Sequence, residues 1–340
     1  MSGTYRAVQA LGSGKLQLVE LPLTTPPAGH VRIRVEACGV CHTDAFTIEG
    51  GIPGLTYPRV PGHEVIGRID LLGPGVDGWQ VGQRVGVGFL GGHCGTCPPC
   101  RRGDFAYCQR QGLSGAHSDG GYAEVMIARA SGLALIPESL KSADAAPLLC
   151  AGLTTFKALR RSRARPGELV AIQGVGGLGH LGIQFANRMG LRVAALARGS
   201  EKADLARQLG AHIYIDTTSQ DAGAELQKLG GARVILATAA NSKSQSALIA
   251  GLAPGGELII AGAGGEEPIS ISGTSLIFGE RTVTGTLTGT SMESEDTLGF
   301  SALLGVRPMI ETLPLAQAEQ AYRRMLGNEA RFRMVLVTGQ

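Results

Sequence analysis

The sequence predicts an α/β protein of two domains, an irregular antiparallel β domain and a doubly wound parallel sheet. The chain has 340 residues, of which 44% are hydrophobic and 17% charged, enough for more than one buried core. Up to about residue 140, apolar residues fall in short alternating segments broken by glycine and proline. From about Cys150 onward, apolar strands alternate with amphipathic helical stretches, which is typical of a parallel sheet.

The charge of the chain is nearly balanced. Lysine and arginine number 31 against 28 aspartates and glutamates, a formal net charge of +3. This gives no argument for binding nucleic acid. The arginines at residues 160–165 form only a short cluster, which we interpret as a solvated turn between the domains.

The compartment is indicated by the N-terminus and by the cysteines. The first residues lack the apolar core of a signal peptide, and no run approaches the ~20 apolar residues that span a bilayer. Seven cysteines, an odd number, are expected to be reduced thiols and metal ligands. We therefore expect a soluble, cytoplasmic protein that binds neither nucleic acid nor a membrane.

The first half is predicted to contain short antiparallel strands. Residues 31–35 alternate cleanly between apolar and polar, and parts of 64–72, 84–89 and 122–127 do the same. Glycine and proline between these segments predict tight turns.

Two cysteines and one histidine, far apart in sequence, form a candidate metal site. His63 lies in the segment 60–67, Cys41 lies upstream of it, and Cys150 lies far downstream. Two thiolates and one imidazole suit a zinc ion with one position open for a substrate oxygen. Alternatively, His63 is an ordinary loop histidine and both cysteines are small core residues. We favour the metal site because the other features of the chain predict the same kind of enzyme.

A second cysteine system lies within one loop, with the spacing C-x2-C-x2-C-x7-C. Four thiolates converging on a tetrahedral zinc ion leave no open position, so this site is predicted to be structural. An iron–sulfur cluster is the alternative, although the further Cys-Pro of that pattern is absent. A nucleic-acid-binding zinc protein would need a basic face, and only Arg101 and Arg102 are present. The four residues are Cys94, Cys97, Cys100 and Cys108.

A glycine-rich turn opens the second half. Residues 168–173 read as a buried strand, 180–189 as a helix, and 191–197 as the next strand. A G-x-G-x-x-G turn within such a unit lets a pyrophosphate approach the helix N-terminus. The turn comprises Gly174, Gly176, Gly177, Leu178 and Gly179.

The doubly wound sheet is predicted to continue through three more strands. These lie at 211–216, 233–237 and 257–261, each preceded by a helical stretch. Beyond about Arg281 we expect the chain to leave this sheet. Residues 332–337 are predicted to form a strand that returns to the first domain.

The end of the strand at 191–197 bears on the choice of cofactor. NAD-specific sheets place an acidic residue about 20 positions beyond the glycine turn. Here Ala197 is followed by Arg198, Gly199 and Ser200, so we expect no carboxylate to repel a 2′-phosphate. Arg198, with Ser200 and Lys202 nearby, predicts NADP(H) in preference to NAD(H). Alternatively, Arg198 is an exposed turn residue and the enzyme accepts NAD.

With these motifs in their observed order, the whole chain resembles the zinc-dependent alcohol dehydrogenases of the medium-chain dehydrogenase/reductase superfamily, bacterial type. The most specific match is the zinc signature Gly62-His63-Glu64-x2-Gly67-x5-Gly73-x2-Val76. The resemblance implies a GroES-like catalytic domain at 1–151 and 289–340 and a Rossmann domain at 152–288. It also implies reversible hydride transfer between an alcohol and a nicotinamide cofactor, two zinc ions per chain, and a dimer or tetramer.

The resemblance also implies a role for individual residues. Cys41, His63 and Cys150 would bind the catalytic zinc. Glu64 would be a neighbouring carboxylate able to approach the metal, and Asp44 would hydrogen-bond the second nitrogen of His63. Asp44 could equally be a turn residue, and Arg333 an exposed strand charge. The remaining expected roles are Thr43 on the substrate oxygen, His42 near the cofactor phosphate or ribose, Thr154 against the nicotinamide, and Arg333 on the pyrophosphate.

One position departs from the family pattern. Many relatives end their proton relay at a histidine five residues after the first cysteine ligand, where this chain has Phe46. Phenylalanine carries no exchangeable proton, so His42 or water would have to substitute. A polyol or formaldehyde dehydrogenase using NAD, and a non-catalytic relative, are alternatives within the same superfamily.

Overall fold

The computed structural model describes residues 3–52, 54–262 and 267–339, and the chain divides into two compact units. The first unit joins Met1–Leu153 to Thr288–Gln340, and the second is Thr154–Leu287. The expected boundaries were Ala151 and Gly289, so they differ by two residues (151 against 153) and by one (289 against 288).

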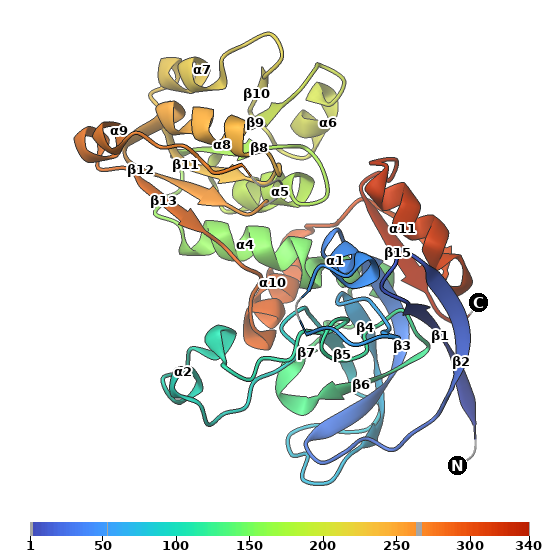
Figure 1. Cartoon of the computed structure of the whole chain (residues 1–340). Helices are drawn as coiled ribbons and strands as arrows, with labels where there is room; N and C mark the ends of the chain where they lie inside the picture. The colour runs from blue at the N-terminus through green and yellow to red at the C-terminus, as the bar shows by residue number, and fades with distance from the viewer. Residues whose placement is uncertain (1–2, 53, 263–266, 340) are drawn as a thin grey trace. The chain divides into compact units, whose positions relative to one another are not determined.

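The main sheet of the first unit is mostly antiparallel (Figure 1). Only β14 and β15 pair in parallel among its described strands, and β6 joins β3 beside the main path. The predicted segments of the first half fall in β3, β4, β5 and β6, which confirms an antiparallel β domain. In sheet order the strands are β14 (Ile310–Pro314), β15 (Arg333–Val337), β3 (His30–Val40), β4 (Val65–Leu72), β5 (Arg84–Val87) and β7 (Leu133–Leu135), with β6 (Val125–Arg129) on β3.

The close approach of β4 to β3 requires a glycine. A Cβ atom at Gly67 would lie 2.1 Å from the carbonyl oxygen of Arg34 on β3, too close for any side chain. Around this point Ile33, Val65 and Ile69 are buried in one apolar cluster. Gly67 therefore allows β3 and β4 to pair closely. Candidate metal ligands lie next to the ends of both strands.

The last strand returns to the first unit, as predicted. β15 pairs antiparallel with β3, from Met334 opposite Val40 to Val337 opposite Ala37, and α11 packs against it. A separate hairpin of β1 (Thr4–Ala10) and β2 (Leu16–Pro22) completes the strands described here, and both termini lie in this unit (Figure 1). The described helices that lie wholly in the first unit are α1 (Thr43–Glu49), α2 (Pro98–Arg101), α3 (Ser142–Ala145), α10 (Ser291–Leu304) and α11 (Ala318–Leu326).

The second unit is a parallel sheet with helices packed on its strands (Figure 1). The order β10-β9-β8-β11-β12-β13 starts in the centre at β8 and proceeds outward in both directions, which is the doubly wound arrangement predicted. The strands are β8 (Leu169–Gln173), β9 (Arg192–Ala197), β10 (Ile213–Asp216), β11 (Ala232–Ala237), β12 (Leu252–Ile260) and β13 (Thr282–Gly285). The helices are α4 (Ala151–Arg161), which spans the boundary, and α5 (Gly179–Arg188), α6 (Ala203–Gln208), α7 (Ala222–Lys228), α8 (Ser242–Leu248) and α9 (Gly273–Gly279).

The expectation that the chain leaves this sheet beyond Arg281 is wrong. β13 begins at Thr282 and pairs in parallel with β12, from Glu257 opposite Thr282 to Ile260 opposite Gly285. The strand is short and lies at the edge, with no fully buried residue, so it has too little apolar pattern to be recognised from sequence.

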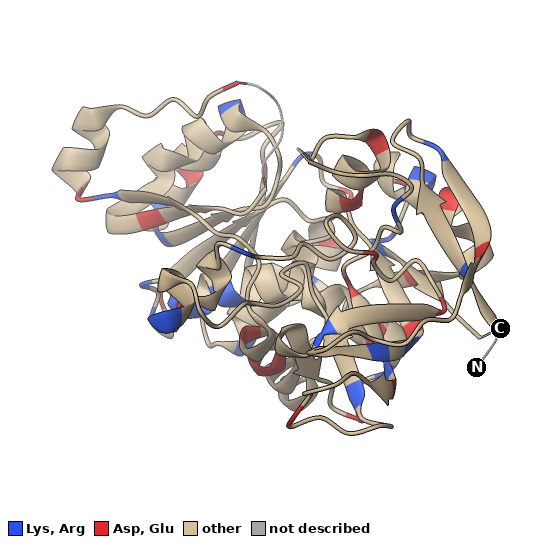
Figure 2. Cartoon of the chain, turned by 60° about the horizontal axis from the view of Figure 1, so that its bottom comes forward, with Lys and Arg blue, Asp and Glu red and all other residues tan. Residues whose placement is uncertain are grey.

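Acidic and basic residues are interspersed in both units (Figure 2). Several form ion pairs across strands: Arg32 and Arg34 share Asp70 at 2.8 and 2.9 Å. Within the described part of the chain, no helix combines the length and apolar character needed to cross a bilayer.

Candidate functional site

The pairing of β3 with β4 brings Cys41 and His63 together. Cys38 on β3 lies opposite Val65 on β4, so the residue that follows β3 and the residues that precede β4 are neighbours. Cys150 comes from a third segment, at the end of the 3-10 turn Ala146–Leu149. Ligand atoms of Cys41, His63, Glu64 and Cys150 all lie within 4.8 Å of one another. The structure therefore brings together the predicted trio and the adjacent carboxylate.

His63 is oriented by a buried carboxylate. Its Nδ1 lies 2.9 Å from Oδ1 of Asp44, while its Nε2 is buried without a hydrogen-bond partner among the described residues. Burial alone would lower the pKa of His63, but Asp44 and the Cys41 sulfur together raise it above its ordinary value. With Nδ1–H donating to Asp44, the lone pair of Nε2 is left for a cation.

Asp44 connects three parts of the first unit. Its Oδ2 accepts the backbone N–H of Cys41 at 2.9 Å and the hydroxyl of Tyr122 at 3.0 Å. Burial and the nearby Asp44 carboxylate raise the pKa of Tyr122, so the phenol stays protonated and donates. The structure thus places Asp44 against a candidate ligand, not in a solvated turn. Tyr122 was missed, because its distance along the chain gives no signal of this contact.

The two thiols have the spacing of zinc ligands. A zinc ion bonded tetrahedrally to two sulfurs at about 2.3 Å holds them about 3.8 Å apart. The sulfurs of Cys41 and Cys150 lie 3.8 Å apart. The hydrogen bond from Cys150 lowers the pKa of Cys41, which favours a thiolate at this position. With the unpartnered Nε2 of His63, these groups fit a zinc ion that keeps one position open.

Glu64 lies beside these ligands and forms a buried ion pair with Arg333. Nη2 of Arg333 donates to Oε1 of Glu64, whereas Oε2 has no hydrogen-bond partner among the described residues. Burial raises the pKa of Glu64 to about 7, although Arg333 acts in the opposite direction. Arg333 is only 4% exposed, so the alternative of an exposed strand charge is wrong. Its Nε also lacks a partner among the residues described, and remains as a donor.

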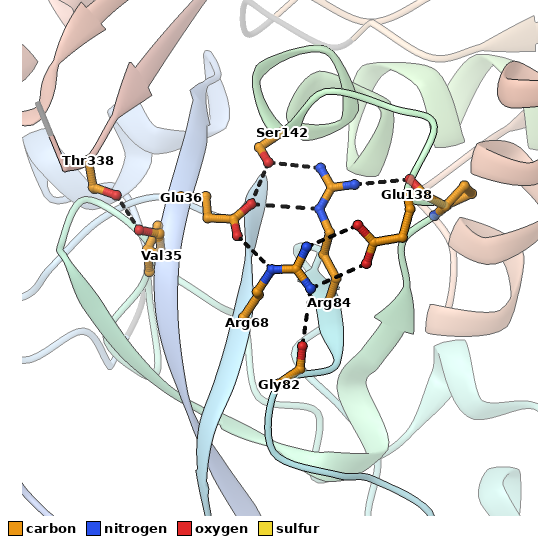
Figure 3. A network of polar contacts seen from close by, with 9 residues as sticks. Val35, Glu36, Arg68, Gly82, Arg84, Glu138, Ser142 and Thr338 are labelled. Atoms are coloured by element: carbon orange, nitrogen blue, oxygen red, sulfur yellow. Dashed lines mark hydrogen bonds and ion pairs between the residues drawn. The ribbon is translucent and has the colours of Figure 1, made fainter.

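A polar network anchors the segment that ends in Cys150 (Figure 3). Oγ of Ser142, the first residue of α3, donates to Glu36 at 2.5 Å and accepts from Arg84 at 2.8 Å. Glu36 is also paired with Arg68 at 3.2 Å. These contacts tie the start of α3 to β3, β4 and β5, and α3 leads through the 3-10 turn directly to Cys150.

The four cysteines of the loop converge as a closed set. Sulfur separations of 3.4 Å (Cys97 to Cys100), 3.9 Å (Cys97 to Cys108) and 4.0 Å (Cys94 to Cys100) bracket the value for a zinc tetrahedron. Backbone N–H groups of Thr96 and Cys97 lower the pKa of Cys94 to about 5. Sulfurs this close fit a single ion and leave no room between them for a cluster of several irons.

The glycine turn of the second unit lies between β8 and α5. Gly174 has φ +92°, and a Cβ at Gly179 would lie 1.8 Å from the carbonyl oxygen of Gly174. A Cβ at Gly176 would meet nothing within 4 Å, so this backbone faces open space. Gly177 and Leu178 follow and lead into α5, with Leu178 as the residue that caps its N-terminus. The tight turn, close packing and open approach are the three features that a pyrophosphate site requires.

The turn after β9 has a contact that the sequence did not indicate. Arg198 and Ser200 are exposed, but the N–H of Gly199 donates to Oδ1 of Asp216 at 2.8 Å and is not available to a phosphate. Asp216, at the end of the neighbouring strand β10, is a carboxylate beside this turn, although none stands at the end of β9 itself. Sequence spacing missed it because the residue comes from another strand. Lys202 donates from Nζ to the carbonyl of Val175 at 3.0 Å, which links this turn to the glycine turn.

The remaining predicted residues are spread over α1 and α4. Thr43 begins α1, with Oγ1 3.7 Å from the sulfur of Cys41, and His42 precedes it in an exposed position. Phe46 on the same helix is 55% exposed. Thr154 is buried on α4, close in sequence to Cys150.

Fold and site together define a class: a two-domain dehydrogenase with a metal centre in a GroES-like domain and a dinucleotide turn in a Rossmann domain. Residues 27–138 match the alcohol dehydrogenase GroES-like domain, and 177–302 match the zinc-binding dehydrogenase family.

Individual relatives are similar to this chain over nearly its whole length. Alcohol dehydrogenase patD of Penicillium expansum is 43% identical over 96% of this chain and 94% of its own. An alcohol dehydrogenase of Geobacillus stearothermophilus is 39% identical over 94% and 96%. The crystal structure of AibC superimposes with a TM-score of 0.92 at 30% identity, covering 99% and 97%. The chain belongs to the zinc-dependent alcohol dehydrogenases of the medium-chain dehydrogenase/reductase superfamily.

Replacing Asp44 by asparagine is expected to weaken zinc binding at Cys41, His63 and Cys150 by about 10- to 100-fold. The amide keeps the size of the side chain, but it removes the charge and one acceptor from a group that holds three donors. Reconstitution of metal-free protein with zinc, in competition with a chromophoric chelator, measures the affinity. The exposed Asp77→Asn variant is the control, and an unchanged affinity in Asp44→Asn would contradict the role given to this carboxylate.

Proposed function

We propose that the chain oxidises alcohols reversibly to aldehydes or ketones with NADP(H) in preference to NAD(H), using one catalytic and one structural zinc ion. The observation that carries the proposal is the buried Nε2 of His63, without a described partner and beside two thiols 3.8 Å apart. Cys41, His63 and Cys150 hold the catalytic ion in this proposal. Cys94, Cys97, Cys100 and Cys108 hold the structural one.

A zinc ion with an open position supplies Lewis acidity that favours the alkoxide form of an alcohol. The residues of the chain position the reactants and move the proton. Thr43 is proposed to hydrogen-bond the substrate oxygen, since its hydroxyl lies near the sulfur of Cys41. Glu64 is proposed to balance the charge of Arg333 through Oε1. Its Oε2 stays available to the metal.

The proton is proposed to leave through water or His42, because Phe46 carries none. His42 is exposed and Phe46 is more than half exposed, so solvent reaches this side of α1. On the cofactor, the glycine turn is proposed to bind the pyrophosphate. The contact of Arg333 with the pyrophosphate, which the family resemblance implies, stays a proposal. Thr154 is proposed to contact the nicotinamide, and Arg198 with Ser200 the 2′-phosphate.

The test is a panel of primary and secondary alcohols assayed with NADP and with NAD, on the wild type and on His63→Ala. The variant loses one of three protein ligands and is expected to lose alcohol oxidation while nicotinamide binding survives. His117→Ala, an exposed histidine of the same unit, is the matched control. Full activity of His63→Ala in a verified metal-free preparation would refute the proposal.

The cofactor preference is tested separately with Arg198→Ala. A charge-assisted hydrogen bond contributes roughly 1.5–3 kcal/mol, so kcat/KM with NADPH should fall about ten- to hundredfold while the NADH value is spared. Arg192→Ala, an exposed arginine at the other end of β9, serves as control. A wild type with higher kcat/KM for NADH than for NADPH would show that the preference is assigned wrongly.

A homo-oligomer, dimer or tetramer, is also proposed. β13 is an edge strand of its sheet, and the nearby helix α9 exposes Ile277 and Phe278 at 75% and 88%. Unpaired edges and exposed large apolar side chains favour association. Light scattering is expected to give a multiple of the chain mass for the wild type and a lower mass for Phe278→Glu. Val81→Glu, an exposed position of the first unit, is the control, and a monomeric wild type would exclude the assembly.

A further inference from the structure

We infer that Asp216 weakens the binding of a 2′-phosphate on the cofactor ribose, and so limits the preference for NADP(H) that Arg198 creates. This inference rests on the proposed nicotinamide site. Asp216 is a specificity-determining residue that the sequence pattern alone does not indicate, because it belongs to β10 and not to β9.

The register of the sheet places the carboxylate at this end. β10 runs parallel to β9 with Asp216 directly opposite Ala197, the last residue of β9. In dinucleotide-binding sheets the ribose 2′-hydroxyl is held by an acid at the end of the second strand, the position that β9 occupies here. Neighbouring strands are separated by about 4.8 Å. The acid absent from the end of β9 is therefore present one strand away.

The carboxylate of Asp216 is fixed in place by hydrogen bonds. Its Oδ1 accepts from the N–H of Gly199 at 2.8 Å and from the N–H and hydroxyl of Thr218 at 2.9 and 2.6 Å. Its Oδ2 accepts from the hydroxyl of Ser219 at 3.1 Å. Donation from Thr218 and Gly199 lowers the pKa of Asp216, which keeps the group ionised at neutral pH. A fixed negative charge thus adjoins the turn after β9.

The turn itself is held from both sides by β10. The hydroxyl of Tyr214 donates to the carbonyl of Gly199 at 2.6 Å, and Asp216 accepts a hydrogen bond from the N–H of the same glycine. Gly199 has φ +74°, in the left-handed region that favours glycine. Arg198 and Ser200 flank this glycine and are exposed. A phosphate that reaches Arg198 must therefore approach a turn that Asp216 holds directly.

Arg198 does not neutralise this carboxylate. Among the described residues no ion pair joins the two, although they lie at the ends of adjacent strands. Glu201 is a second carboxylate near the turn, close enough that a Cβ on Gly199 would clash with it. Glu201 is exposed and is not anchored to the turn by a described hydrogen bond, so it can move away from a ligand. Asp216 cannot do so without releasing Gly199.

The experiment compares binding of NADPH and NADH, which differ only in the 2′-phosphate, by calorimetry on the zinc-loaded protein. The measured quantity is the ratio of the two Kd values. Asp216→Asn removes the charge and retains an acceptor oxygen, so the ratio is expected to shift about fivefold toward NADPH. Tyr214→Phe loosens the same turn without changing its charge, and Glu225→Gln removes a carboxylate from α7. Both controls are expected to keep the wild-type ratio.

Each other outcome has a defined meaning. An unchanged ratio in Asp216→Asn, or an equal shift in Tyr214→Phe, would overturn the inference. If Glu201→Gln shifts the ratio of Kd values more than Asp216→Asn does, the inference is also overturned, because Glu201 would then be the residue that discriminates NADPH from NADH. If thermal melting shows that Asp216→Asn is unfolded, Asp216→Ser makes the same test. A wild type that binds neither nucleotide would contradict the proposed function itself, a result distinct from binding without discrimination.

Discussion

The hydrogen bond between Asp44 and His63 is the contact on which the candidate metal centre depends. A buried carboxylate is costly unless donors surround it, and Asp44 has three: the ring of His63, the N–H of Cys41 and the hydroxyl of Tyr122. These donors come from the loop after β3, the loop before β4 and the loop before β6. One carboxylate thus connects two candidate ligands and fixes the nitrogen that the imidazole offers.

Both candidate sites are built at the ends of strands, where rigid backbone meets adaptable loops. In the first unit, Gly67 lets β4 approach β3, and the ends of these strands present Cys41 and His63. In the second unit, the carboxyl ends of β8, β9 and β10 present the glycine turn, Arg198 and Asp216. The sheet register, more than the loops, therefore decides which side chains meet.

The sequence predicted those features that depend on residue type and local spacing. Cys41, His63 and Cys150 were expected as one set, and the structure brings their ligand atoms together. The glycine turn was predicted because a strand and a helix flank it within a short stretch. The four-cysteine loop was also predicted from spacing alone, and its sulfurs converge.

Features that depend on pairing between distant segments could not be read in the same way. Tyr122 meets Asp44 only after β6 has paired with β3, and Arg333 meets Glu64 only after β15 has joined the sheet. Asp216 reaches Gly199 from a neighbouring strand. β13 was missed because an edge strand of four half-exposed or exposed residues carries little apolar periodicity.

The most direct test of this account is a zinc measurement on the intact protein: quantification per chain together with zinc-edge X-ray absorption. We expect two zinc ions per chain, with an averaged ligand set of mostly sulfur and a minor nitrogen or oxygen contribution. Sulfur dominates because six cysteines and a single histidine provide the ligands. A single zinc ion with only sulfur ligands would contradict the account, because the centre at His63 would then not bind metal.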